Sequence, residues 1–314
     1  MNGYSNGGYS NGGYSDGGYH LARRQVGRTV EKRTIGLGWA RDLPDLRDKS
    51  LDDEELVSFL QTDVKKTFVL DSGATLKCKI IEENLQYCTQ VEDQGSLGSC
   101  TAQSVVGMLE YLMRRGTGDH VDGSRLFVYK ATRNLLGWTG DTGAYLRTAI
   151  QSVATFGMPP ESYYPYQIQN FEEEPSAFHY SFAANYKALR YTRLDPHGKP
   201  PAAVLDNVRW ALAAGYPAVF GFSVYSSLGN AADIPYPTVN DTLQGGHAVM
   251  AVGYDDDRNC VNAPNGALFI RNSWGQSWGD QGYGYLPYEY ILNGLATDFW
   301  TCFKAEWIDN KQFQ

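Results

Sequence analysis

The sequence predicts an α+β fold in two halves, because helical patterns occupy the first part of the chain and strand patterns the second. Its 314 residues can form one large domain or two ordinary ones. An apolar fraction of 42% and a charged fraction of 20% are typical of a globular protein with a sizeable core. A cleft between two such halves is a natural place for a binding or catalytic site.

Three segments carry the helical pattern. The strongest begins at Cys100 and is expected to end at Gly116, after two arginines that suit a helix C-terminus. One apolar stripe recurs along it at intervals of three and four residues: Val105, Val106, Leu109, Leu112 and Met113. Two further helices are predicted over residues 144–156 and 202–214, because each stretch is followed by a glycine and then a proline.

Strand patterns follow the last of these helices. They predict strands over residues 218–224, 247–254, 267–274, 282–286 and 300–306. Residues 255–266, which join the second and third of these strands, are polar and are expected to form an exposed hairpin tip.

Charge and composition exclude several classes of partner. With a net charge of −8, the chain lacks the basic character of a nucleic-acid binder. No apolar run approaches the roughly 18 residues of a membrane span, and the N-terminus is too polar for a secretory signal peptide. We expect a monomer without a membrane partner, cytoplasmic by default, with secretion by a route not visible in the sequence as the alternative.

No metal or other cofactor is expected. The chain has no C-x-x-C pair, so neither a zinc knuckle nor a thioredoxin-like site is indicated. Two Asp-x-x-Asp spacings fall within residues 42–48, but no Gly or Glu follows them at the spacing of a calcium loop.

The N-terminal region differs in composition from the rest of the chain. Residues 2–20 repeat a Gly-, Asn-, Ser- and Tyr-containing unit, which predicts a disordered tail or, alternatively, a tyrosine-bearing strap that docks on the protein. Residues 36–48 are expected to be extended and irregular around Trp39, and a short helix is predicted to begin at Ser50. We therefore divide the chain into a repeat tail (1–20), an N-terminal extension or prosegment-like region (21–70) and a catalytic domain (71–314).

Cys100 is the candidate nucleophile. A thiol attacks as its thiolate, and a helix N-terminus favours the anion because its free N–H groups and dipole point at it. Cys100 occupies such a position at the end of D-Q-G-S-L-G-S-C. The glycines at 95 and 98 leave room for the backbone of a substrate to approach closely.

His247 is the candidate base among five histidines. It begins the apolar strand H-A-V-M-A-V-G-Y, whereas the other four lie in the tail or in polar, loop-like contexts. Asn272, in the next strand, carries an amide oxygen that could accept a hydrogen bond from the imidazole. Trp274 and Trp278 could shield that bond from water and so strengthen it. Taken alone, each of these residues could equally belong to the core.

Three sequence blocks together resemble the catalytic blocks of papain-like cysteine peptidases, including bacterial members of that family. They are Q-G-S-L-G-S-C (94–100), G-G-H-A-V-M-A-V-G-Y (245–254) and R-N-S-W-G-Q-S-W-G-D-Q-G-Y-G-Y (271–285). The resemblance spans roughly residues 75–310. It implies a two-lobed fold in which a helical left lobe carries the nucleophile helix. An antiparallel β right lobe would carry His and Asn, with the active-site cleft between the lobes.

The resemblance also implies a role for each matched residue. Cys100 would form a thioester acyl-enzyme, with His247 as base and then acid, Asn272 orienting the imidazole and Gln94 donating to the oxyanion. The residues implied to bind substrate are Gly140, Asp141, Gly143, Gly246, Ala248 and Trp274. Ala248 would border the pocket for the second residue before the cut, where its small size leaves room for a bulky apolar side chain.

The chain departs from the family pattern in its cysteines. Many members have a cysteine three residues before the nucleophile, and here that residue is Leu97, so the corresponding disulfide is absent. An aromatic residue often follows the nucleophile, and here it is Thr101. The other four cysteines (78, 88, 260 and 302) are interpreted mainly as buried thiols, with a Cys78–Cys88 disulfide as the leading alternative.

The predicted function is cysteine endopeptidase activity on protein or peptide substrates, restrained as in a zymogen. We expect residues from about 20 to 45 to cross or flank the cleft, with Trp39 as an anchor, against the alternative of a disordered tail plus a clamp on the body. An amidase or transpeptidase on the same triad is a second enzymatic reading. A catalytically silent binding or storage protein is the third, and the presence of Cys, His and Asn argues against it.

Overall fold

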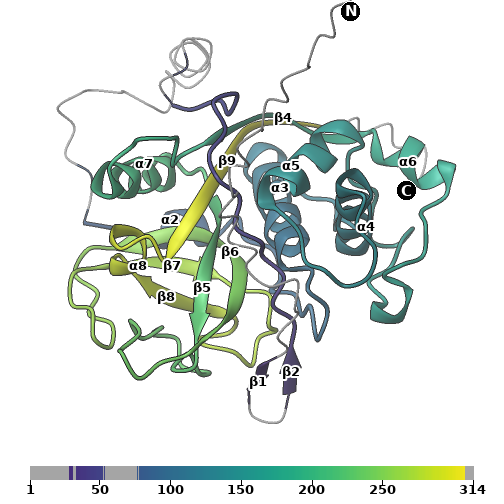
Figure 1. Ribbon diagram of the computed structural model, residues 1–314. Helices are drawn as coiled ribbons and strands as arrows, with labels where there is room; N and C mark the ends of the chain where they lie inside the picture. Colours follow the sequence, from purple (N-terminus) through teal and green to yellow (C-terminus); the bar gives the residue numbers. More distant parts are fainter. Residues whose placement is uncertain (1–27, 31–32, 52, 54–75, 77, 308–314) are drawn as a thin grey trace, which may run out of the picture.

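The computed structural model describes residues 28–30, 33–51, 53, 76 and 78–307 (Figure 1). The repeat predicted to be a tail, at residues 2–20, lies outside these ranges, as does most of the helix predicted to begin at Ser50. Ser50 itself forms a parallel β-bridge with Arg193.

Two halves lie side by side in the described chain, one helical and one built on a sheet (Figure 1). The helical half contains α3 (Cys100–Thr117), α4 (Arg125–Leu136), α5 (Leu146–Thr155), the 3₁₀ helix η1 (Ile168–Asn170) and α6 (Ala177–Ala183). The other half adds three helices: α2 (Glu82–Leu85), α7 (Pro201–Ala213) and α8 (Glu289–Leu292). Within the described ranges, no helix is both long and apolar enough to span a bilayer.

An antiparallel sheet forms the second half, as predicted. Its strands are β3 (Lys79–Ile80), β4 (Tyr186–Arg193), β5 (Ala218–Tyr225), β6 (Leu243–Asp255), β7 (Ala267–Arg271), β8 (Tyr283–Pro287) and β9 (Ala296–Trp307). They pair in the order β4-β9-β5-β6-β7-β8, and β3 pairs with the end of β6. A separate pair, β1 (Arg28–Val30) and β2 (Arg33–Ile35), forms a small hairpin.

The central helix is α3, and it begins at Cys100 as predicted. Every residue from Cys100 to Met113 is buried, because α4 and α5 pack on one side of the helix and the sheet packs on the other. The helix ends at Thr117 rather than at the predicted Gly116. The reason is that Gly118 adopts a φ of 85°, and its N–H closes the last turn on the Arg114 carbonyl.

Strand β6 belongs to both cores of the protein. Ala248, Met250 and Val252 pack into the core of the helical half. Val249 and Ala251, which alternate with them along the strand, pack into the second core beneath α7 and α8. A strand that is buried on both faces reads as a continuous apolar run, which is the pattern that the sequence shows here.

Helix α4 and strand β4 are the longest of the elements that were not predicted from the sequence. Charged residues inside α4 make the segment look exposed, but Arg125, Lys130 and Arg133 are all buried. Arg125 pairs with the buried Glu110 at 2.9 Å, and Arg133 pairs with Glu172 at 2.9 Å. The sequence of such a helix therefore looks polar by composition although its charged side chains lie inside the protein.

The cysteines differ in part from the prediction. All five lie in the described part of the chain and remain as thiols, so the Cys78–Cys88 disulfide is not formed. Cys260 and Cys302 are buried as predicted, but Cys78 is exposed and Cys88 is half-buried. Cys78 precedes β3, whereas Cys88 follows α2 and lies near Arg114, Arg271 and Tyr283, so α2 separates the two thiols.

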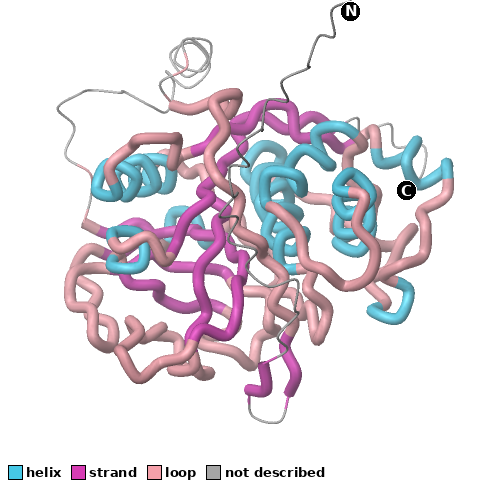
Figure 2. The backbone as a smooth tube through the Cα atoms, in the orientation of Figure 1, coloured by secondary structure: helices cyan, strands magenta, loops and turns pink. Residues whose placement is uncertain are grey.

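A non-helical stretch of the N-terminal region, residues 33–50, passes between the two halves (Figures 1 and 2). We call it the crossing segment. Ile35, Leu37 and the two glycines of I-G-L-G are buried, whereas Leu43 and Leu46 are largely exposed. The crossing segment therefore enters the interior over its first half and returns to the surface over its second.

Candidate active site

Cys100 lies at the N-terminus of α3 with no exposed surface. The N-cap residue Ser99 makes no side-chain cap, because its hydroxyl pairs with Tyr166 at 2.6 Å. The first N–H groups of the helix are thus left for the site. Burial raises the pKa of the Cys100 thiol to about 11, although backbone N–H groups of Ala248, Gly38 and Thr101 face the sulfur and oppose the rise.

His247 faces the site from β6 and is held by Asn272. The His247 Nε2 atom lies 2.7 Å from Asn272 Oδ1, which also accepts the Ser273 N–H at 2.8 Å. Because Asn272 Oδ1 accepts, Nε2 carries the proton and Nδ1 of the neutral ring is left to take one. Nδ1 is buried and has no hydrogen-bond partner among the described residues. Burial lowers the pKa of His247 to about 4, so the resting ring is neutral.

Two tryptophans cover the His–Asn pair. The Trp274 ring stacks on His247 with 4.5 Å between ring centroids, and Trp278 meets Trp274 edge-on at 5.7 Å. Both tryptophans are 2% exposed. A hydrogen bond under such a cover is shielded from water and is stronger for it.

Gln94 and Ser273 complete the arrangement. Gln94 Nε2 donates to the carbonyl oxygens of Leu97 at 2.8 Å and Gly36 at 3.0 Å. The Ser273 hydroxyl donates to Gln94 Oε1 at 2.6 Å, which fixes the amide with its NH₂ group toward the site. Ser273 was not predicted from the sequence, although it directly follows Asn272. The sequence-predicted Cys, His, Asn and Gln are thus brought together.

This chain matches the family model described as papain family cysteine protease over residues 79–297. The chain belongs to the papain family of cysteine proteases. It is 30% identical over 274 residues to an uncharacterized peptidase C1-like protein of Acanthamoeba polyphaga mimivirus, with 84% of this chain and 85% of that protein covered. It is 30% identical to cathepsin K of Gallus gallus, with 63% of this chain and 54% of that protein covered.

One solved cysteine protease structure agrees with this assignment, and a second shares the fold. The crystal structure of xylellain, a cysteine protease from Xylella fastidiosa, superposes with a TM-score of 0.67 at 33% identity, covering 90% of this chain and 98% of xylellain. Procathepsin L2 from the Tenebrio molitor larval midgut superposes with a TM-score of 0.64 at 20% identity, covering 85% and 77%, which shows the fold alone. The predicted two-lobed papain-like fold is confirmed, and the protein is a cysteine peptidase, a hydrolase.

Of the six residues expected to bind substrate in this papain-family chain, Trp274 covers His247 and the other five lie in two groups. Gly246 and Ala248 are on β6 beside His247, and Gly143 lies just before α5. Gly140 and Asp141 have structural partners instead. The Arg133 guanidinium donates to the Gly140 carbonyl at 2.7 Å, and the Asp141 carboxylate accepts the Gly98 N–H at 3.0 Å. Tyr129 also donates to Asp141 at 2.6 Å.

The crossing segment bonds to these same backbone groups. Trp39 N–H donates to the Gly246 carbonyl at 3.1 Å, and Ala144 N–H donates to the Gly38 carbonyl at 2.8 Å. Ala40 N–H returns a bond to the Ala144 carbonyl at 3.0 Å, so that Trp39 and Ala144 form a parallel bridge. A side chain at Gly38 could not be accommodated, since its Cβ would lie 1.8 Å from the Gly98 carbonyl oxygen.

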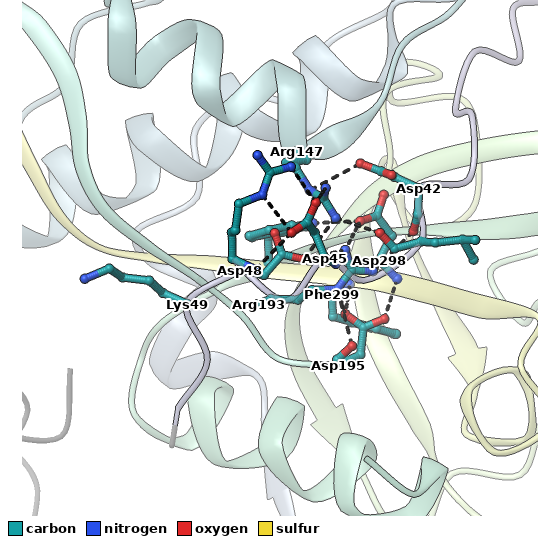
Figure 3. Close-up of polar contacts among 12 residues, drawn as sticks. Asp42, Asp45, Asp48, Lys49, Arg147, Arg193, Asp195, Asp298 and Phe299 are labelled. Carbon is teal, nitrogen blue, oxygen red and sulfur yellow. Dashed lines mark hydrogen bonds and ion pairs between the residues drawn. The ribbon is translucent and has the colours of Figure 1, made fainter. Parts of the chain in front are cut away.

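An ion-pair cluster fixes the second half of the crossing segment (Figure 3). Arg147 pairs with Asp42 at 3.3 Å and Asp48 at 2.9 Å, and Arg193 pairs with Asp48 at 3.4 Å. Asp42 and Asp48 belong to the two Asp-x-x-Asp spacings, and their carboxylates pair with arginine side chains in the structure. Within the described residues, no group of three or more His, Cys, Asp or Glu side chains is placed to hold a metal ion.

Proposed function

We propose that the protein is an endopeptidase that cleaves peptide bonds through Cys100, His247, Asn272 and Gln94, and that the crossing segment holds it inactive. The observation that carries this proposal is the position of the segment on the atoms that the reaction needs. The Gly36 carbonyl oxygen accepts a hydrogen bond from Gln94 Nε2 at 3.0 Å, and the Gly38 N–H faces the Cys100 sulfur.

The chemistry follows from the atoms that these residues present. His247 Nδ1 removes the Cys100 proton, and the sulfur attacks the carbonyl carbon of the scissile bond. The oxyanion that forms is held by Gln94 Nε2–H and by the Cys100 backbone N–H at the start of α3. The C–N bond then breaks as His247 returns the proton to the leaving amine, which leaves a thioester. Water, activated by the same imidazole, hydrolyses the thioester and releases the acid product.

Burial explains why the covered site is silent. With a thiol pKa of about 11 and an imidazole pKa of about 4, the resting pair is neutral thiol and neutral imidazole at pH 7. Departure of the segment admits water and solvates charge, which favours the thiolate–imidazolium pair that attacks.

The crossing segment is placed so that it blocks without being cut. The group that it presents to the Cys100 sulfur is the Gly38 N–H, so no carbonyl carbon is offered at that contact. Its bridge to Ala144 is parallel, so the segment runs in the same direction as the chain at Ala144. Its backbone bonds to Gly95, Ala144 and Gly246 are each worth about 1 kcal/mol, which gives a restraint of several kcal/mol.

Labelling with an epoxide thiol reagent, followed by mass mapping, tests this function. We expect modification at Cys100 alone, with parallel loss of peptidase activity, and none in the Cys100→Ala variant. Deleting residues 1–40 is expected to raise both the rate of labelling and peptidase activity. Modification at a different cysteine in an active preparation would overturn the mechanism, and unchanged activity after the deletion would overturn the restraint.

A further inference from the structure

The Trp39 side chain lies in a pocket that exists only because two strand residues are glycines. A Cβ atom at Gly221, on β5, would lie 1.8 Å from the indole Cε2 atom. A Cβ atom at Gly246, on β6, would lie 2.7 Å from the indole Cε3 atom. Glycine inside a strand weakens a sheet and often marks a place where another group approaches closely. Here the group that approaches is an indole ring.

The base of this pocket is the carboxylate of Asp298 on β9. Asp298 has no exposed surface, and its Oδ2 atom accepts the Trp39 Nε1–H at 3.1 Å. Its other oxygen, Oδ1, accepts the Trp300 Nε1–H at 2.7 Å and lies 3.4 Å from Arg193 (Figure 3). Asp298 is a non-glycine residue at a φ of 65°, a strained conformation for an ordinary residue. Asp298, Trp300 and Arg193 all belong to β4 and β9 of the body and not to the crossing segment.

The pocket lies beside the candidate nucleophile. Gly221 pairs with Ala248 across the β5–β6 ladder, and the Ala248 N–H faces the Cys100 sulfur. A substrate side chain in this pocket would therefore belong to a residue near the scissile bond. Ala248 was expected to border the pocket for the second residue before the cut, so we assign the Trp39 pocket to that substrate position.

The charges around Asp298 favour a neutral donor over a cation. Without the crossing segment and its aspartates, Asp195 and Asp298 still pair with Arg193, and Arg147 lies over the same Trp300 ring as Arg193, so this part of the body has balanced charge. Asp298 Oδ1 is already paired with Arg193 and with the Trp300 Nε1–H. A carboxyl group that is already paired in this way attracts an incoming cation weakly. One of its oxygens can still accept an N–H in either protonation state.

We propose that the Trp39 pocket is a specificity pocket that selects tryptophan in the substrate, with Asp298 as the specificity-determining residue that accepts the indole N–H. The inference rests on the proposed endopeptidase function. The sequence led us to expect a bulky apolar side chain at the second substrate residue before the cut. The pocket instead calls for a bulky side chain that donates one hydrogen bond. In the closed protein, Trp39 occupies the place of that substrate residue.

The size of the preference for tryptophan over phenylalanine follows from the Asp298 Oδ2 atom, which phenylalanine leaves without a donor. A phenylalanine can enter the same space but leaves Asp298 Oδ2 buried without a partner. We expect a loss of roughly 10- to 100-fold in kcat/KM relative to tryptophan for that defect. The closest probe is the tryptophan analogue in which sulfur replaces the ring N–H, because it keeps the shape and removes only the donor. It should lose as much as phenylalanine does.

The test uses the full-length Trp39→Ala variant, in which the pocket is vacated. Its kcat/KM is measured on peptides that differ only at the second residue before the cut: tryptophan, its sulfur analogue, phenylalanine, leucine and arginine. Tryptophan is expected to be preferred over each of the others. Adding Gly221→Ala to this variant narrows the pocket and should abolish the preference for tryptophan over leucine. Equal cleavage of tryptophan and its sulfur analogue, or a preference for arginine, would overturn the proposal.

Binding separates this inference from the proposed function. The same peptides are titrated against the full-length Cys100→Ala, Trp39→Ala variant, which cannot turn them over. Tighter binding of tryptophan without cleavage by the active variant would support the pocket and contradict the endopeptidase function. Cleavage of all peptides without a tryptophan preference would contradict the pocket alone. If the peptides are neither bound nor cleaved, both the pocket and the endopeptidase function are contradicted.

Discussion

Replacing Trp39 by alanine should activate the full-length protein. A fully buried Trp→Ala change costs about 3–5 kcal/mol, and the half-buried Trp39 side chain should lose about 2 kcal/mol of that. The lost hydrogen bond to Asp298 adds about 1 kcal/mol. Because the crossing segment docks only in the closed state, the equilibrium should shift toward release by about 30- to 150-fold. The initial rate should rise by that factor until most molecules are open.

The assay is the initial rate on a fluorogenic peptide, normalised by titrating active sites with the epoxide reagent. Leu46→Ala is the matched control, because Leu46 lies on the same segment but is 93% exposed. This control should leave the rate unchanged within about twofold. A Trp39→Ala protein that is folded and no faster than wild type would refute the role of the crossing segment as the restraint.

Three further predictions concern single residues. Cys100→Ala should abolish turnover with unchanged thermal unfolding, whereas Asn272→Ala, which removes only the residue that orients the ring, should lower kcat by about 10- to 100-fold. Gly221→Ala in the otherwise native chain should speed epoxide labelling of Cys100, because the new Cβ would clash with the Trp39 ring. Gly229→Ala is the control and should not change the rate of labelling, since its Cβ meets nothing within 4 Å. Burial raises the pKa of Asp298 from its ordinary 3.8 to about 7, so between these values the folded state binds more protons than the unfolded state, and this group's contribution to stability falls as pH rises. The free energy of unfolding in urea is measured for wild type and for Asp298→Asn at pH 4 and at pH 7. The value for Asp298→Asn minus the value for wild type should rise by about 2–4 kcal/mol between these pH values. A difference that does not depend on pH would contradict this reasoning.

The candidate site could be predicted because its residues carry local signals. Cys100 begins a helix, His247 begins an apolar strand, and Asn272 and Gln94 stand in recognisable blocks. Their mutual distances could not be read from the sequence, and neither could Ser273, which has no signal of its own beyond following Asn272. What fixes the Gln94 amide is a bond to Ser273 that forms only after folding.

Other features depend on contacts between distant parts of the chain. A segment at the cleft was expected over residues from about 20 to 45, from their Gly-rich and basic composition and from Trp39 as an anchor, but the pocket formed by Gly221, Gly246 and Asp298 was not. No local pattern links a glycine in a strand to a tryptophan far before it. Helix α4 was missed for a related reason, because Arg125 is neutralised by Glu110, which belongs to another helix. A charged residue in a sequence is usually taken to be exposed, but a residue paired in this way is buried.

The double role of strand β6 limits how this enzyme can open. Because alternate residues of one strand are locked into two separate cores, the halves cannot swing apart about a hinge without pulling one set of side chains out of its packing. Such a movement would cost several kcal/mol for each large side chain that is exposed. The distance between Cys100 and His247 is therefore set once, at folding. Under the proposed function, substrate therefore gains access only when the crossing segment leaves, and the two catalytic side chains keep their positions while it does.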